Sequence, residues 1–161
     1  GIARGIGRLG YGFVCQSGSS YRALAYGCLE TPPHQDTSVR IKALYDGVRE
    51  QIENCSPHFM SVERLYFGQN RTTAEAVWQV RGAILLLGAQ YRLPVIEPKP
   101  SEVKLTVCGD GTAEKRQVQL MIQQLLNLPE IPRPDDTADA LGIALAGLAI
   151  VRSPQYAYGR R

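Results

Sequence analysis

Two aspartates three residues apart open the last apolar segment of the chain. Asp136 and Asp139 stand in the run DTADAL, directly after a loop rich in proline. This spacing places both carboxylates on one face of a helix. Carboxylate oxygens are ligands for magnesium, so the pair could hold a metal ion. It could equally be an ordinary helix start, in which Asp136 is the N-cap and Asp139 reaches back as in a capping box.

A third carboxylate comes from a different segment. Residues 58–62 (HFMSV) predict a short buried strand, and Glu63 follows directly at its carboxyl end. One interpretation of Glu63 is a solvated surface acid beside Arg64. The other is a metal ligand, because sites in open α/β sheets gather outside the strand ends. Three converging carboxylates could bind metal ions that hold the attacking and leaving oxygens of a phosphodiester, which favours hydrolysis of a nucleic-acid backbone.

The acids are set in a chain that alternates strand and helix patterns. Two runs rich in aromatic and aliphatic residues, 10–17 and 21–29, flank a Gly-Ser-Ser turn and predict an antiparallel hairpin. Apolar spacing and turn signals predict the further elements: helices over 37–54, 73–91, 101–108, 112–126 and from Asp136, and strands over 58–62 and 93–96. We expect Thr37 or Ser38 to cap the first helix and Thr112 to cap the fourth.

The order of these elements predicts the fold class. With a first strand that ends at Gly1-Ile2, the chain should form an α/β domain with a mixed five-stranded sheet. The first three strands are expected to be antiparallel, and helices are expected on both faces. We expect one domain over residues 1–151 and a basic, mobile tail over residues 152–161.

The amino-acid composition is typical of a globular protein and not of a membrane-spanning one. The 161 residues are 44% apolar and 20% charged, and no apolar run reaches the roughly 18 residues that a spanning helix needs. We therefore expect a soluble protein with no membrane partner. The net charge of +3 permits a polyanionic partner without requiring one.

The cysteines and histidines do not suggest a site. Four cysteines are scattered without a C-x-x-C pair, so we expect free intracellular thiols rather than disulfides or zinc ligands. His34 and His58 have no ligand-like spacing to any cysteine or acid, and we expect both to be structural.

Six motifs occur in order along nearly the whole chain. They are Gly1 to Gly5 (GIARG) with Gly10 to Gly12 (GYG), Val62 to Phe67 (VERLYF), Gln79 to Gly82 (QVRG), Val103 to Thr106 (VKLT), Gly109 to Lys115 (GDGTAEK) and Asp136 to Leu141 (DTADAL). In combination they resemble RuvC, the family of bacterial Holliday-junction resolvases. The resemblance implies an RNase H-like fold, a cytoplasmic homodimer, and paired symmetric nicks in a four-way DNA junction during recombination and repair.

The resemblance also implies a set of catalytic residues. In this family four acids hold two magnesium ions, for which manganese can substitute. Glu63, Asp136 and Asp139 match the last three acids, but Ala3 stands where the first aspartate of Gly-Ile-Asp-Pro-Gly belongs, and Arg4 replaces the proline. A methyl group cannot ligate magnesium. We therefore predict that the chain binds junctions but cleaves them poorly or not at all.

Two explanations of Ala3 compete. A deliberate inactivation would exchange aspartate for alanine and keep the other acids, as is found here. A natural non-cutting relative would explain Arg4, because a single-site inactivation would have left the proline.

Two lysines match basic positions near the active site of the family. Lys104 and Lys115 would contact the scissile phosphate or stabilise charge in the transition state, and are counted with the catalytic residues. Without the resemblance, both would be interpreted as solvated side chains on a helix face.

The loop after Glu63 is expected to contact DNA. Tyr66 matches a family aromatic that stacks on bases at the junction centre, and Phe67 either shares this role or packs beneath the loop. Gln69, Asn70 and Arg71 extend the same loop toward the phosphate backbone. Family partners also include the branch-migration proteins RuvA and RuvB. The helix over 73–91 would form the dimer seam and bury part of Ile84 to Leu87 there.

Other classes of protein share parts of this pattern. Actin-like sugar kinases share the broad topology, but 161 residues leave no room for their second lobe. A non-cleaving module that binds four-way junctions remains an alternative, as does an RNase H-like nuclease that acts on RNA. The lysines and loop aromatics favour DNA over RNA.

Overall fold

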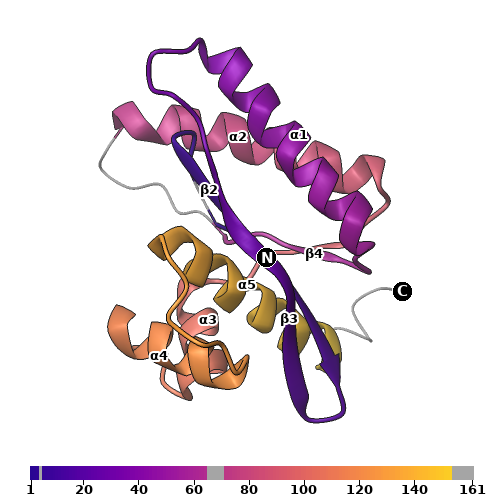
Figure 1. Cartoon of the computed structure of the whole chain (residues 1–161), viewed down its shortest axis with the longest axis vertical. Helices are drawn as coiled ribbons and strands as arrows, with labels where there is room; N and C mark the ends of the chain where they lie inside the picture. Colours follow the sequence, from indigo (N-terminus) through magenta and orange to yellow (C-terminus); the bar gives the residue numbers. More distant parts are fainter. Residues whose placement is uncertain (4, 65–70, 154–161) are drawn as a thin grey trace.

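The computed structural model describes residues 1–3, 5–64 and 71–153 (Figure 1). The elements in chain order are β1 (Ile2–Ala3), β2 (Arg8–Ser17), β3 (Ser20–Glu30), α1 (Thr37–Cys55), β4 (Met60–Ser61), α2 (Arg71–Gln90), β5 (Val95–Ile96), α3 (Pro100–Cys108), α4 (Lys115–Leu125) and α5 (Asp135–Arg152). This order confirms the predicted sequence of strands and helices.

The strands form a mixed sheet that consists of two hydrogen-bonded parts. β1, β2 and β3 pair antiparallel in that order, and β4 pairs parallel with β5. A parallel bridge between Ile2 and Val62 joins the two parts. The spatial order is therefore β3-β2-β1-β4-β5, with β1 between the long hairpin and the short parallel pair.

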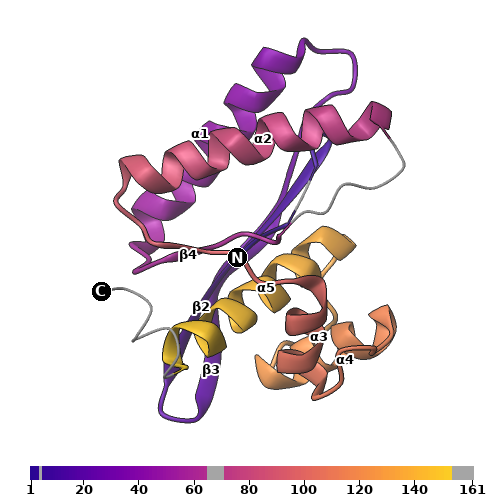
Figure 2. The ribbon, with the colours of Figure 1, turned by 180° about the vertical axis from the view of Figure 1, so that it is seen from behind.

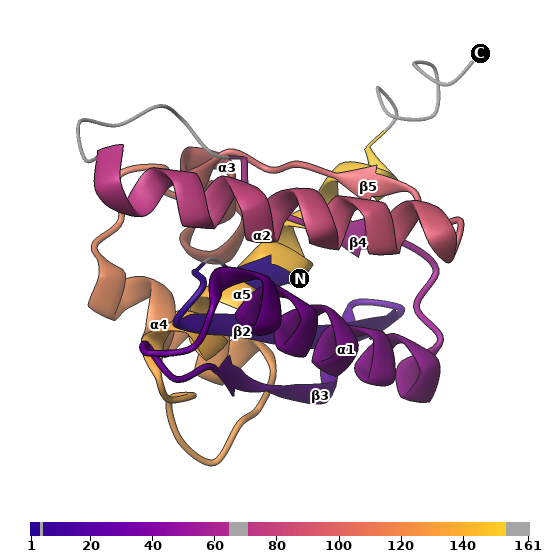
Figure 3. The ribbon, with the colours of Figure 1, turned by 90° about the horizontal axis from the view of Figure 1, so that it is seen from above.

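Helices cover both faces of these strands. α1 and α2 lie on one side, and α5 lies on the other with α3 and α4 packed behind it (Figures 1 and 2). Seen from above, α1 and α2 run side by side (Figure 3). Each face of the sheet thus has its own hydrophobic core.

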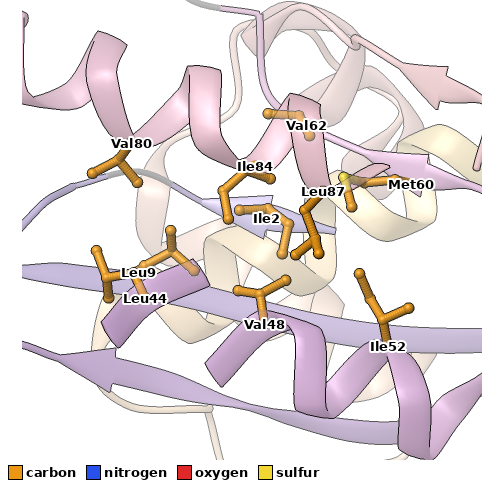
Figure 4. Close-up of a cluster of buried hydrophobic side chains, with 10 residues drawn as sticks. All are labelled: Ile2, Leu9, Leu44, Val48, Ile52, Met60, Val62, Val80, Ile84 and Leu87. Carbon is orange, nitrogen blue, oxygen red and sulfur yellow. The ribbon is translucent and has the colours of Figure 1, made fainter. Parts of the chain in front are cut away.

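The core under α1 and α2 follows directly from sequence periodicity. Leu44, Val48 and Ile52 recur every four residues and form the buried stripe of α1. They meet Ile84 and Leu87 of α2 over the strands (Figure 4). Complete burial of each such side chain contributes about 1.5–3 kcal/mol. This cluster therefore fixes α1 and α2 on the sheet.

The other core depends on small residues. α5 is buried from Ala140 to Gly147, and three of its residues in that run are alanine. A Cβ placed on Gly10 of β2 would come closer than 3.0 Å to the carbonyl oxygen of Asp136, and one on Gly12 would collide with Leu141. The helix therefore approaches β2 at a distance that only glycine permits.

A buried hydrogen bond ties the same helix to β4. Ser61 is 2% exposed, and its hydroxyl donates to the Ile143 carbonyl at 2.8 Å. α5 is thus held against both β2 and β4, on either side of β1.

The predicted cap of the first helix is wrong. α1 begins at Thr37, and Asp36 is its N-cap residue, without a hydrogen bond from its side chain. Neither Thr37 nor Ser38 is the N-cap, because both already lie within the first helical turn.

Two later helix starts also differ from expectation. α4 begins at Lys115, because the Asp110 carboxylate accepts hydrogen bonds from the Thr112 backbone and hydroxyl, at 2.8 and 2.7 Å, and closes a turn there. α5 begins at Asp135 with Pro134 as N-cap, so Asp136 lies inside the helix and is not its cap. The capping interpretation of the aspartate pair is therefore wrong.

Several expectations concern the chain as a whole. All four cysteines are free thiols, as predicted. None of the helices in the described part of the chain has the length and apolar composition that a bilayer crossing requires. α5 continues to Arg152, so the predicted boundary at residue 151 falls inside the helix; the expected tail from residue 154 lies outside the described residues.

Gly10→Ala should destabilise the protein by about 1–3 kcal/mol or more, because its methyl group must displace the backbone of α5. Gly82→Ala is the matched control. Gly82 lies on α2 with nothing within 4 Å of an added Cβ, so this change should be neutral or stabilise by about 0.5–1 kcal/mol. Chemical denaturation of both variants measures the difference. Equal stability of the two would contradict the close approach of α5 to β2.

Candidate active site

The backbone of β4 stays extended beyond the last residue of the strand. The Val62 N–H donates to the Ile96 carbonyl and the Arg64 N–H donates to the Pro98 carbonyl, both at 2.9 Å. Glu63 therefore continues the strand alternation, and its side chain points opposite to that of Val62.

This alternation places Glu63 beside Ala3. Ile2 and Val62 are paired in parallel and both belong to the core under α1 and α2. The next residues on the two strands, Ala3 and Glu63, consequently share the opposite face, toward α5. Ala3 packs in the α5 core and is 2% exposed.

The start of α5 packs on the strands beside Ala3. Gly10 is the antiparallel partner of Ala3, and the Asp136 carbonyl packs on Gly10. Asp139 follows three residues later on the same face of the helix and is half-buried. The structure thus brings Ala3, Glu63 and the first turns of α5 to one end of the sheet, as the strand-end rule predicts.

The acids at this end do not form a metal-binding group. Within the described ranges, no three His, Cys, Asp or Glu side chains are placed together so that they could hold a metal ion. The methyl group of Ala3 lies where the sequence comparison predicts a carboxylate. The residues present therefore do not fit a metal pair, and the roles of Glu63, Asp136 and Asp139 as ligands stay predictions.

Lys115 lies beside these acids. Its ammonium is 2.8 Å from the Asp135 carboxylate. The hydrogen bond that Lys115 donates to Asp135, and then the charges of Asp139, Asp135 and Asp136, raise the pKa of Lys115. The same hydrogen bond with Lys115 lowers the pKa of Asp135. Lys115 therefore lies near the aspartates that are predicted to be catalytic, whereas its own catalytic role and its contact with DNA stay predictions.

Lys104 lies on α3, near the turn that precedes α4. It is half-buried, and its charge contributes to lowering the pKa of Asp110, after the larger effect of the hydrogen bonds from Thr112. Its catalytic role also stays a prediction.

Most of the predicted DNA-binding loop lies outside the described residues. This holds for Tyr66, Phe67, Gln69 and Asn70, and also for Arg4. Arg71 is the first residue of α2.

The loop that follows Ala3 is held by residues that sequence reasoning missed. The Thr31 hydroxyl donates to the Ile6 carbonyl at 2.5 Å, and the Thr31 N–H donates to the Gly7 carbonyl at 3.0 Å. Arg40 of α1 donates from Nε to the Thr31 hydroxyl at 2.9 Å. Gly5 has a φ of 123°, which favours glycine at this turn. No sequence signal connects Thr31 to this loop, because the contact spans 25 residues.

Two cavities differ in their relation to the acids. A small one, about 30 Å³, is lined by Ala3, Glu63 and Arg81 among others, and Arg81 forms an ion pair with Glu97 at 2.6 Å. A larger one, about 570 Å³, lies among β2, α1, β4 and the end of α5, and its described lining contains none of the predicted site residues. The larger cavity therefore does not belong to the candidate active site.

Comparison with known proteins agrees with this architecture. The family model "Crossover junction endodeoxyribonuclease RuvC" matches residues 1–147. This chain belongs to the RuvC family. Proteins named crossover junction endodeoxyribonuclease RuvC are similar to it: that of Moorella thermoacetica is 50% identical over 145 residues (90% of this chain, 87% of the relative), and that of Pseudothermotoga lettingae is 43% identical over 150 residues (93% of each).

Solved RuvC structures have the same fold. The structure of Thermus thermophilus RuvC superposes with a TM-score of 0.87 at 33% identity, covering 94% of this chain and 93% of that one. T. thermophilus RuvC in complex with a Holliday junction substrate superposes with a TM-score of 0.86 at 31% identity and the same coverage. The α/β fold expected from the resemblance is therefore confirmed.

Thr31→Val should destabilise the protein by about 1–3 kcal/mol, because it leaves the partly buried Ile6 carbonyl and the Arg40 donor without their partner. Thr31→Ser keeps the hydroxyl and should stay close to the unmodified chain. Urea unfolding of the three proteins measures the free energies. Equal losses for Val and Ser would mean that the threonine methyl group, and not the hydrogen bonds, supports the loop.

Proposed function

We propose that this chain binds four-way DNA junctions at the end of the sheet formed by β1, β4 and the start of α5, and that it hydrolyses them poorly or not at all. Membership of a family of crossover junction endodeoxyribonucleases supports the substrate. The observation that carries the proposed loss of cleavage is Ala3, a buried methyl group that packs in the α5 core beside Glu63.

The proposed loss of cleavage follows from ligand chemistry. Divalent cations such as magnesium, or manganese in its place, take oxygen ligands and would supply charge stabilisation at the phosphodiester, with two ions implied by the resemblance. Glu63, Asp136 and Asp139 would remain as three of the four oxygen donors. The missing donor would stand on β1, next to Glu63 at the end of β4 and to the aspartates of α5. Its loss should therefore affect all three remaining ligands.

Without bound cations, this end of the protein would bind DNA through its basic groups. The acids repel a phosphate, and the repulsion between two unit charges falls only as the inverse of their distance. Lys115 and Lys104 are the basic side chains predicted to oppose it, so we propose that both contact the DNA backbone. Binding should therefore weaken as salt increases.

We also propose a homodimer and, by family analogy, contact with RuvA and RuvB on the junction. Within the predicted seam, Ile84 and Leu87 are 1% and 0% exposed and belong to this chain's own core. The part of that stretch that could pack against a second copy is therefore Leu86, which is 57% exposed, with the half-buried Leu85 beside it.

A second candidate function is a non-cleaving module that recognises junctions. The buried methyl group of Ala3, at the position where the resemblance implies the first acid, supports it. An RNase H-like nuclease that acts on RNA is the less favoured alternative, since the similar solved complex contains a Holliday junction.

Ala3→Asp, alone and with Arg4→Pro, should restore cleavage of a labelled synthetic four-way DNA junction with magnesium by about 100-fold or more over the unmodified chain, because it returns the missing ligand. Ala3→Asn is the matched control. It has nearly the shape of aspartate without its charge and should stay inactive.

Junction binding by gel shift, measured for every variant, separates the two halves of the proposal. If all forms bind and none cuts, the junction-binding module is the better account. If none binds a four-way junction more tightly than duplex DNA or an RNA hybrid, the proposed function itself is wrong.

A further inference from the structure

We infer that Asp135 is a positioning residue that keeps Lys115 at the start of α5 and competes with DNA phosphate for its ammonium. The inference rests on the proposed junction binding, and it adds an acid that the sequence comparison does not place among the four ligands. It predicts that this chain binds DNA less tightly than it would if Lys115 were not paired with Asp135.

The Asp135 carboxylate is held at both oxygens by α4. Lys115 Nζ lies 2.8 Å from Oδ2, and Gln119 Nε2 donates to Oδ1 at 3.1 Å. Lys115 and Gln119 are four residues apart, so they project from the same face of α4. The carboxylate thus has two partners from one helix, and it belongs to the first residue of the next.

Gln119 makes the arrangement different from an ordinary surface ion pair. It is only 9% exposed, so its amide has a fixed position. The side chains of Lys115 and Asp135 are 58% and 62% exposed, and the amide gives the carboxylate a second partner that does not depend on Lys115. When a phosphate approaches, Lys115 can turn to it while Asp135 keeps its hydrogen bond with Gln119.

The acids around Lys115 are the reason why this competition should affect DNA binding. Asp135, Asp136 and Asp139 are three acids on the first turns of α5, and Lys115 is the base that the structure places against them. A lysine bound to Asp135 has part of its charge compensated, so it attracts an arriving phosphate less strongly. Removal of Asp135 should release Lys115 for the phosphate.

The experiment measures the affinity of the full chain for a fluorescent four-way DNA junction, without divalent metal, at low and high salt. Asp135→Asn should tighten binding about two- to fivefold at low salt, which is the range of an exposed ion pair. The gain should disappear at about 0.5 M salt, where such pairs are screened. Asp135→Ala should show the same gain. This result would mean that the effect comes from the loss of the carboxylate and not from the asparagine side chain.

Two controls separate the ion pair from a general effect of charge. Glu114→Gln removes one negative charge next to Lys115 from a carboxylate for which no ion pair is found among the described residues, and it should give less than half the gain. In a Lys115→Ala background, Asp135→Asn should give no gain, because there is no ammonium to release.

Each outcome decides the inference. A gain that persists without Lys115, a gain equal to that of Glu114→Gln, no gain at all, or weaker binding of Asp135→Asn would each overturn it, while junction binding by the unmodified chain would leave the proposed function intact. If the unmodified chain does not bind the junction, the proposed function fails first.

Discussion

The close approach of α5 to the sheet is the constraint on which the site depends. Gly10 and Gly12 leave no side chain between β2 and the helix, and the alanine-rich face of α5 fills the space with backbone and small groups. A helix held at this distance has a fixed rotation, because its larger residues fit in one orientation only. That rotation determines where Asp136 and Asp139 lie relative to β1.

β1 is short, but it belongs to both cores. Ile2 packs under α1 and α2, and Ala3 packs against α5. An alanine at position 3 suits a buried place, since an unpaired carboxylate there would lose its hydration. The fold therefore does not need an acid at this point. The family's acid would be a cost to stability that only a bound cation could offset, which is a common relation between stability and activity.

Charge at the site comes from several helices and strands. Glu63 comes from the end of β4, Lys115 from the start of α4, and the aspartates from α5. Several acids and the Lys115 ammonium lie close together here, so ion pairs such as Lys115–Asp135 influence how the surface meets a polyanion. The β1–β2 loop beside them is set by Thr31, which has no charge and acts through hydrogen bonds alone.

The sequence alone determined the order of elements, the hairpin, the face of α1 that is buried and the position of Glu63 at a strand end, because these depend on local periodicity and turn residues. Its motifs also predict that Ala3 stands where the family has an acid. It could not place the N-caps, because a cap depends on which competing hydrogen bond forms, as the Asp110 turn shows for α4. Only the tertiary structure decided that Thr31 holds the loop after Ala3 and that Asp135 pairs with Lys115. Those contacts join residues 25 and 20 positions apart, and nothing but the packing of one element on another brings them together.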